Sequence, residues 1–374
     1  MKFAVSREAL LRPLQLVAGV VERRQTLPVL SNLLLTVDGS TLSMTGTDLE
    51  VQIVARIDLD APAASAGEIT IPARKLMDIW RALPEGARVE FALDDQRAIL
   101  KSGRSRFQLS TLPASDFPAL DDSATETAFS LGQDALRRLI DRTAFSMAQQ
   151  DVRYFLNGLL LEVTGEHVRA VATDGHRLAM CTLIPEAGTL APVGSDTRQQ
   201  IIVPRKGVLE LARLLSEGSG DVELGIGSSH LRAVVGGFTF VTKLVDGKFP
   251  DYERVVPRGG DREVVGDRLA LREAFLRTAI LSNEKYRGVR ITLGQETLTV
   301  QANNPEQEEA EEAVAVDYDG DALEIGFNVS YLLDVLGVLD TERVRVTVSD
   351  ANSSALIEEP EAGDSLYVVM PMRL

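Results

Sequence analysis

The chain has 374 residues, of which 45% are hydrophobic and 25% are charged. This composition is typical of globular proteins and excludes a disordered or fibrous chain. The formal net charge of -16 argues against a polyanionic partner if the charge is evenly spread, because the whole surface would then repel it.

The N-terminal segment and the few cysteines and histidines exclude several further classes. Arg7, Glu8, Arg12 and Pro13 interrupt the first apolar stretch, which therefore fits neither a signal peptide nor a membrane span. Cys181 is the only cysteine, and the three histidines lack HExxH spacing, so we expect no disulfide, no metal site and no cofactor. We expect a soluble intracellular protein without a membrane partner.

Three segments of the chain share one pattern, in which an apolar run, a turn at or next to glycine, an alternating run and a polar turn follow one another. Period-2 alternation around turn residues predicts a β-hairpin in each. The segments are residues 32–48, 158–174 and 288–304.

Apolar residues at helical spacing flank each hairpin. The first copy has Leu10, Leu14 and Val17 before its hairpin, where Pro13 favours a kink, and Leu76, Ile79, Trp80 and Leu83 after it. The same arrangement recurs in the second copy, at residues 136–143 and 208–215, and in the third, at residues 271–278 and 332–339. A strand pair ends each copy and begins VEFAL, VELGI or VRVTV. The pattern predicts an α+β chain of three similar domains, 1–122, 123–254 and 255–374.

Thr173, Asp174 and His176 have the residue types of a nucleophile and its base. The other copies have Thr47-Asp48 and Asn303-Asn304 at the same place, so a shared turn explains the Thr and the Asp without catalysis. His176 is unique to the second copy, which leaves a structural and a binding role open. No P-loop and no GxGxxG motif supports nucleotide binding.

Basic residues recur at related helical positions. Arg138 with Arg142, and Arg268 with Arg272, lie four apart on one predicted helix face, which on its own is typical of a solvated surface. Arg74-Lys75 and Arg205-Lys206 fall in the first turn of the second helices, where the helix dipole disfavours cations and favours an anion. These two pairs of cations are therefore suited to bind a phosphate. Because the chain has no sequence-recognition motif, we expect any nucleic-acid contact to be with the phosphate backbone and not with the bases.

The charge is uneven along the chain. The first two copies each have 14 basic and 16 acidic residues, whereas the third has 11 and 23. Five glutamates lie between Glu306 and Glu312, and in the first copy Arg104 and Arg106 alternate with Phe107 and Leu109. A head-to-tail contact between two chains would pair these charges and would either close into a ring or grow as a filament.

Many segments in the same order together resemble one family, the bacterial DNA polymerase III beta subunit or sliding clamp. Among them are GTDLE, SGRSRF, STLPASDFPAL, QDVRYFLNG, ATDGHRLA, DGKFPDY, ILSNEKYRGVR, ANNPEQEEAEE and the terminal VVMPMRL. The resemblance covers the whole chain. It implies two helices packed on antiparallel β-sheets in each domain, and a head-to-tail homodimer whose six domains close into a ring.

The resemblance also implies roles for individual residues. The positions that match DNA contacts are Arg24, Arg74, Gln149, Gln150, Tyr154, Arg205 and Lys206. Those that match a peptide-binding cleft are Leu156, Thr173, Gly175, His176, Arg177, Leu178, Pro250, Arg254, Val255, Val368, Met370, Pro371, Met372, Arg373 and Leu374. Those that match the dimer contact are Arg104, Arg106, Phe107, Leu109, Ile280, Leu281, Glu306, Glu308 and Glu309.

As a family member the chain would be a cytoplasmic, non-catalytic processivity subunit that encircles duplex DNA without sequence specificity. Its implied partners are a second copy, the polymerase III alpha subunit, the delta subunit of the clamp loader, translesion polymerases and mismatch-repair factors. An enzyme using Asp174 and His176 and a repeat adaptor without a DNA role are the alternatives. The terminal MPMRL could instead be a docked core strand, and the long loop 186–200 receives no function.

Overall fold

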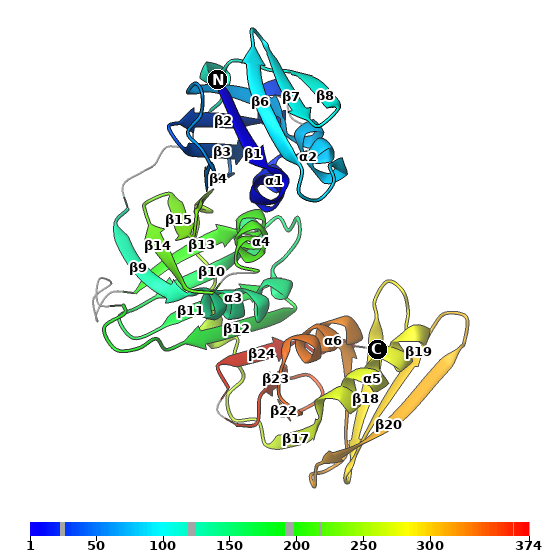
Figure 1. Ribbon diagram of the computed structural model, residues 1–374. Coiled ribbons are helices and arrows are strands. Elements are labelled where there is room, and N and C mark those ends of the chain that lie inside the picture. The colour runs from blue at the N-terminus through cyan, green and yellow to red at the C-terminus, as the bar shows by residue number, and fades with distance from the viewer. Residues whose placement is uncertain (23–26, 119–124, 191–197, 217–218, 362, 374) are drawn as a thin grey trace. The chain divides into compact units, whose positions relative to one another are not determined.

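The computed structural model describes residues 1–22, 27–118, 125–190, 198–216, 219–361 and 363–373. Within these residues, two helices and eight strands follow one another in the same order three times (Figure 1). The repeated order confirms the α+β class and the threefold similarity that the sequence predicts. No helix in this part of the chain is long and apolar enough to span a membrane.

The first copy comprises β1 (Lys2–Ser6), α1 (Arg7–Val20), β2 (Asn32–Asp38), β3 (Thr41–Thr47), β4 (Val51–Asp58), β5 (Gly67–Pro72), α2 (Ala73–Ala82), β6 (Arg88–Asp94), β7 (Arg97–Ser102) and β8 (Ser105–Ser110). The second comprises β9 (Thr127–Gly132), α3 (Gln133–Asp141), β10 (Gly158–Val163), β11 (Val168–Thr173), β12 (Arg177–Leu183), β13 (Gln199–Pro204), α4 (Arg205–Leu214), β14 (Asp221–Ile226), β15 (His230–Val235) and β16 (Phe238–Lys243). The third comprises β17 (Arg262–Asp267), α5 (Arg268–Thr278), β18 (Gly288–Gly294), β19 (Thr297–Asn303), β20 (Glu309–Asp317), β21 (Leu323–Asn328), α6 (Val329–Val338), β22 (Arg343–Val348), β23 (Ala355–Glu358) and β24 (Ser365–Val369).

All three predicted hairpins are present, and so are the six predicted helices. In α2 the buried side chains Leu76, Met77 and Trp80 follow the helical period. Helix α1 runs from Arg7 to Val20 with Pro13 inside it, so the proline does not end the helix. The strand pair expected at the end of each copy is a set of three strands, and the strand before each first helix escaped prediction because five or six alternating residues give a weak signal.

The chain forms two compact units. Unit 1 comprises Met1–Asp134, Thr189–Val193 and Lys206–Leu244, and unit 2 comprises Ala135–Gly188, Gly194–Arg205 and Val245–Leu374. The division passes through the second copy, because strands of that copy extend the sheets of both other copies.

Unit 1 contains a four-stranded sheet, β1-β6-β7-β8, and an eight-stranded sheet, β5-β2-β3-β4-β16-β15-β14-β9. The pairing of β4 with β16, from Val51↔Thr242 to Ala55↔Phe238, joins the first and second copies. Strand β8 pairs with β7 along its whole length and is the last strand of its sheet.

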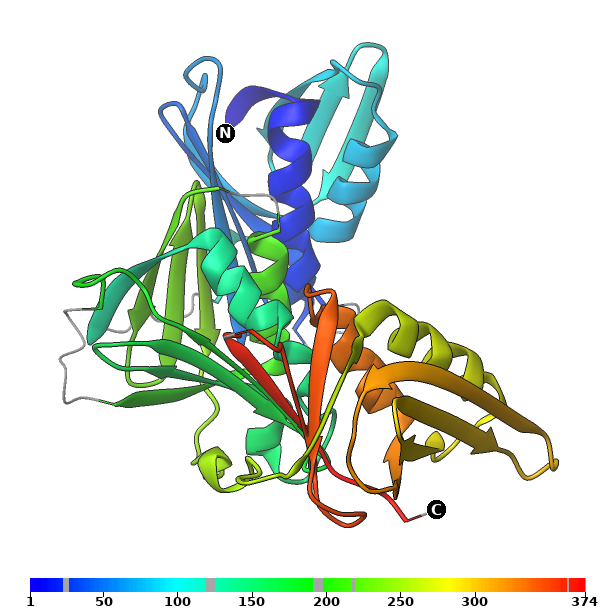
Figure 2. The same ribbon diagram turned by 90° about the horizontal axis from the view of Figure 1, so that it is seen from below.

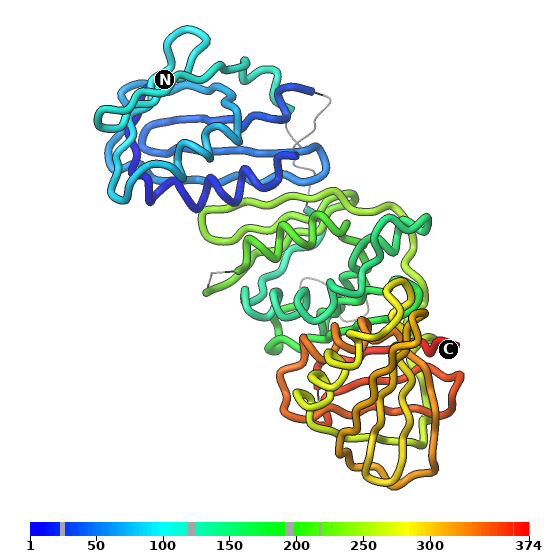
Figure 3. The backbone as a smooth tube through the Cα atoms, turned by 90° about the vertical axis from the view of Figure 1, so that its right-hand side faces the viewer, coloured from blue at the N-terminus to red at the C-terminus, as the bar shows by residue number. Residues whose placement is uncertain are grey.

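Unit 2 contains one antiparallel sheet of twelve strands, β13-β10-β11-β12-β24-β23-β22-β17-β20-β19-β18-β21. The pairing of β12 with β24 joins the second and third copies. Helices α5 and α6 lie side by side in the third copy (Figure 2). Strands β18, β19 and β20 run together beyond them (Figure 3), and only Val316 and Asp317 of β20 pair with β17.

Candidate functional site

The Thr-Asp turn has the same hydrogen bonds in the first and second copies. The Thr47 hydroxyl donates to the carbonyl of Val51 over 2.9 Å, and that of Thr173 donates to the carbonyl of Arg177 over 2.6 Å. The carboxylates of Asp48 and Asp174 each accept from two backbone N–H groups that follow them. Leu49 and Gly175 occupy the same left-handed position, with φ of 77° and 89°. Because the turn engages Thr173 and Asp174 fully, their identity needs no catalytic explanation.

This turn places His176 on the surface next to the last strand. The His176 side chain is exposed, and its backbone carbonyl accepts from the N–H of Met370 over 2.9 Å. No cluster of His, Cys, Asp and Glu with the geometry of a metal site occurs among the described residues. The turn therefore leaves the His176 side chain open to solvent.

Arg177, which we expected among the polar residues of the cleft rim, is largely buried. Its side chain is 11% exposed and forms ion pairs with Asp174 and, across to α6, with Asp334. It also donates to the carbonyl of Phe145 over 2.8 Å, and its guanidinium lies 4.5 Å from the ring centroid of Tyr331. A guanidinium with so many partners holds the second copy to the third and has few hydrogen bonds left for a ligand.

The apolar floor of the candidate cleft is formed by β12 and β24. Leu178 lies directly opposite Val368, and both side chains are almost fully buried in a cluster with Leu160, Val171 and Phe249. Leu156, also buried, lies in the preceding 3-10 segment η4 (Tyr154–Asn157). A buried apolar floor beside exposed apolar side chains is what a short peptide anchor requires.

The C-terminal residues follow the strand without belonging to it. Strand β24 ends at Val369, Met370 is 43% exposed, and Pro371 and Met372 are half-buried. Met372 is held by its N–H, which donates to the carbonyl of Gly326 over 2.8 Å. The alternative of a docked core strand for MPMRL is therefore wrong for Met370, Pro371, Met372 and Arg373, which follow β24 and remain at least partly exposed. Leu374 lies outside the described residues.

A second wall comes from η6 (Tyr252–Arg254). Pro250, Arg254 and Val255 are exposed there, and a hollow of about 600 Å³ is lined by Asp251 and residues 253–258. The Arg254 side chain, 86% exposed, pairs with Asp251 over 2.8 Å. Tyr252 is buried between these residues and fixes the wall to the sheet.

The attachment of this wall is a buried polar network that the sequence did not predict. The hydroxyl of Tyr252 donates to both carboxylate oxygens of Glu162, which also accepts from Arg198 and Gln200. Burial raises the pKa of Glu162, but hydrogen bonds from Gln200, His167 and Arg198 outweigh it and hold the pKa below its ordinary value. Glu162 lies in the apolar run GLLLEV, two positions after Leu160 and so on the same face of β10. A lone acid in an apolar run is a signal for a buried polar contact, but only the fold supplies its partners.

The expected DNA contacts at the start of α2 have the predicted geometry. Arg74 and Lys75 are exposed in the first turn, which has no acidic residue and no side-chain cap. The free N–H groups of that turn and the two cations favour an anion.

At the start of α4 the cations are partly engaged. Lys206 forms ion pairs with Asp48 and with Glu22, the latter at 2.7 Å. Burial lowers the pKa of Lys206, but these carboxylates outweigh it and raise the pKa above its ordinary value. Arg205 donates to the carbonyl of Met147 over 3.3 Å. A phosphate at Lys206 would therefore compete with two carboxylates.

The loop before η4 presents Gln149 and Gln150 to solvent, and Tyr154, the first residue of η4, is 57% exposed. Asp151 holds the loop by accepting from Arg153, which lowers the pKa of Asp151 to about 2. Arg24, the remaining expected DNA contact, lies outside the described residues.

Arg138 and Arg142 do not form a solvated face, as their spacing had suggested. Arg142 is 2% exposed and pairs with Asp340 and Glu359, and Arg138 pairs with Asp340 and Asp364. Asp340, Glu359 and Asp364 all come from the third copy. The two arginines therefore stabilise unit 2 by pairing with acids of the third copy.

The expected dimer contacts lie on two strand edges. Arg104, just before β8, and Arg106, within it, are exposed, while Phe107 is half-buried and Leu109 buried. In unit 2, Glu306, Glu308 and Glu309 are exposed where β20 begins. Next to β20, η7 (Ala279–Leu281) exposes 75% of Ile280 and part of Leu281.

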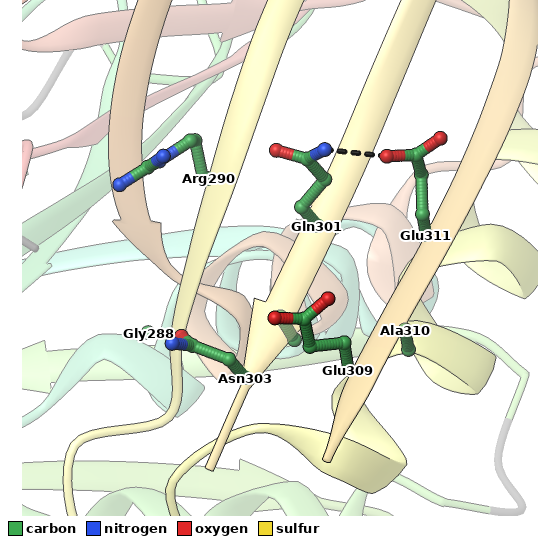
Figure 4. Close-up of a pocket in the computed structure, with 8 residues that line it drawn as sticks. Gly288, Arg290, Gln301, Asn303, Glu309, Ala310 and Glu311 are labelled. Carbon is green, nitrogen blue, oxygen red and sulfur yellow. Dashed lines mark hydrogen bonds between the residues drawn. The ribbon is translucent and has the colours of Figure 1, made fainter. Parts of the chain in front are cut away.

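The outer face of β18, β19 and β20 carries a shallow hollow of about 690 Å³ (Figure 4). Arg290, Gln301 and Glu311 form one row across the strands, and Gln301 donates to Glu311. Asn303 and Glu309 form the next row. The hollow is polar and continues the acidic start of β20.

Comparison with known proteins identifies the family. Models of the DNA polymerase III beta subunit match in three parts: its N-terminal domain over residues 1–121, its central domain over 130–251 and its C-terminal domain over 253–373. This chain belongs to the DNA polymerase III beta subunit family.

Full-length relatives agree with this assignment. The beta sliding clamp of Pseudomonas aeruginosa is 64% identical over 374 residues, and that of Escherichia coli K12 is 54% identical over 375, with 100% of both chains covered in each case. A crystal structure of the P. aeruginosa clamp bound to griselimycin superimposes with a TM-score of 0.95, at 64% identity and complete coverage of both chains. A Bartonella birtlesii clamp with the same ligand gives 0.94 at 37% identity, again with complete coverage.

Members of the beta subunit family are sliding clamps, so this chain is a non-catalytic processivity subunit of DNA polymerase III. The alternative of an enzyme that uses Asp174 and His176 is therefore wrong. The turn belongs to a binding protein.

Proposed function

We propose that two copies of this chain assemble head to tail into a closed ring around duplex DNA. The ring tethers the polymerase to its template, so that the polymerase rebinds from a high local concentration and not from bulk. The domain bounds 1–122, 123–254 and 255–374 are part of this proposal, supported by the three matched family models. The chain would act in the cytoplasm, without a cofactor.

The pair of open strand edges carries the ring proposal. Edge strand β8 is flanked by Arg104 and Arg106, whereas residues 309–315 of β20 pair only with β19 and begin in a run of glutamates. An unpaired edge accepts another strand by main-chain hydrogen bonds, and opposite charges fix which edge it takes. Two such contacts related by a twofold axis close a ring.

Contacts to phosphate would hold DNA weakly and uniformly. Arg74, Arg205, Lys206 and the loop with Gln149, Gln150 and Tyr154 offer charge and hydrogen bonds, and Arg24 completes the expected set. Phosphate contacts carry no sequence information and exchange easily, so the ring would slide.

The cleft around Leu178, Val368, Met370 and Val255 would hold short motifs of partner proteins. Its buried floor and exposed methionine suit an apolar anchor, and His176 and Arg254 supply a polar rim. The proposed partners are the polymerase III alpha subunit, the delta subunit of the clamp loader, translesion polymerases and mismatch-repair factors.

A topological experiment tests the ring. The protein is loaded by a clamp loader on nicked circular DNA at moderate salt, and its retention is followed by gel filtration before and after a restriction enzyme cuts the circle. We expect retention on the circle and rapid loss from the linear product. Equal retention on both forms would contradict encirclement and would favour an adaptor bound at the surface.

A further inference from the structure

The sheet face that forms the cleft floor continues beyond it. On β12 and β24, Leu178 lies opposite Val368, and two residues further along Met180 lies opposite Leu366. Side chains two apart on a strand share a face, so Met180 and Leu366 extend the floor. Both are only partly buried and pack against the same apolar cluster as Leu178 and Val368.

A separate hollow of about 450 Å³ opens over this extension. Met180 and Leu366 line it, together with Ile184, which follows the end of β12 and is 79% exposed. A large aliphatic side chain this exposed, beside two half-buried ones, forms an apolar surface without a cover from the described residues.

The polar side of the hollow is held rigidly. Arg169 donates to Thr182 over 2.8 Å and to the hydroxyl of Tyr252 over 2.9 Å. Tyr252 is bonded in turn to the buried Glu162, so one network fixes both this hollow and the η6 wall of the cleft. Such a surface needs little ordering when a ligand binds.

The remaining charges of the hollow are acidic. Glu358 lies opposite Leu366 on the next strand, and Asp364 follows β23 and precedes β24. Their side chains are 28% and 30% exposed and keep access to solvent, although each pairs with an arginine, Arg345 or Arg138. Arg169, the basic residue of this lining, donates to Thr182 and Tyr252.

We propose that this hollow is an extension of the peptide cleft and binds residues that flank the partner's motif. An apolar flanking side chain would pack against Ile184, Met180 and Leu366, and a neighbouring Lys or Arg would face Glu358 and Asp364. The inference rests on the proposed peptide cleft, whose floor on β12 and β24 shares one sheet face with the hollow. It would let partners that share a motif differ in affinity through their flanks.

Synthetic peptides test the extension on the full-length protein. A fluorescein-labelled peptide with the binding motif of the polymerase III alpha subunit is compared with versions that carry a Leu-Lys pair beyond the motif at one end or the other. We expect one extended peptide to bind roughly three- to tenfold tighter, since an apolar side chain leaves water. Replacing its added Lys by Glu should remove part of the gain, and added salt should reduce the Lys-dependent part.

Two matched variants locate the gain. In Ile184→Ser the ratio of extended to core affinity should fall to about one. Leu269→Ser, which alters an exposed leucine on α5, should keep the wild-type ratio. A gain that persists in Ile184→Ser, or no gain at either end while the core peptide binds normally, would overturn the extension alone. Failure of the core peptide to bind would overturn the proposed cleft as well.

Discussion

At the scale of single residues, Arg177 has a role different from that of its neighbours in the ATDGHRLA segment. Its guanidinium joins Asp174, Asp334 and the carbonyl of Phe145, and it stacks over Tyr331. Three of these partners lie on other elements, so the side chain links parts of unit 2 that the sequence separates by more than 150 residues. A change in peptide affinity on mutating Arg177 would therefore combine the loss of direct contacts to the peptide with the loss of the local structure around the cleft.

Replacing Arg177 should test this structural role. We expect Arg177→Ala to lower the free energy of unfolding by about 2–3 kcal/mol, because it leaves Asp334 and the Phe145 carbonyl without their donor. The matched control is Arg254→Ala, whose side chain is 86% exposed and which should change stability by less than about 0.5 kcal/mol. Urea unfolding of both variants measures the difference in the free energy of unfolding. Equal stabilities of the two variants would contradict a structural role for Arg177.

At the scale of secondary-structure elements, α2 and α4 begin in the same way but differ in how free their cations are. Arg74 is exposed at an uncapped helix start, whereas Lys206 already pairs with Glu22 and Asp48. The start of each helix is a local feature of the sequence. The carboxylates at Lys206, however, come from distant residues: Glu22 follows α1, and Asp48 belongs to the Thr-Asp turn of the first copy. Two similar motifs therefore should contribute unequally to DNA binding.

Salt dependence should reveal this inequality. We expect Arg74→Ala to weaken binding to any duplex sequence and to reduce the slope of log affinity against log salt by about one. Lys206→Ala should reduce the slope less, since its ammonium gives up protein partners to reach a phosphate. Anisotropy titrations over a range of KCl measure the slopes, with Arg81→Ala in the last turn of α2 as the control. Equal salt slopes for Arg81→Ala and Arg74→Ala would contradict a specific phosphate contact at Arg74.

At the scale of the whole molecule, the open edges of β8 and β20 would determine assembly. Ile280 exposes 75% of its side chain in the single chain and belongs to η7, which packs against β20. An aliphatic side chain so exposed beside an unpaired acidic edge is typical of an interface. Covering it with a second copy would bury apolar area and leave the charges at the rim.

A charge at this position should separate the subunits without unfolding them. We expect Ile280→Asp to raise the dimer dissociation constant at least about tenfold, since an unpaired carboxylate would be buried in the contact. Leu269→Asp, at another exposed aliphatic residue of the third copy, should leave the dimer unchanged. Light scattering across a dilution series measures the mass, and dimer dissociation that matches wild type would place Ile280 outside the interface.

The sequence by itself determined the threefold repeat, the six helices, the three hairpins and the family, because these depend on local periodicity and on ordered motifs. It also predicted the Thr-Asp turn, whose hydrogen bonds join residues at most four apart. Only the tertiary structure decided that Arg138, Arg142 and Arg177 pair with acids of the third copy, that Lys206 is partly neutralised and that Glu162 anchors a cleft wall. Helical spacing shows which helix face a charged residue shares with its neighbours. The residues that pack against that face come from distant parts of the sequence, so only the fold reveals them. Their burial of the charge then determines whether it binds a ligand or stabilises the fold.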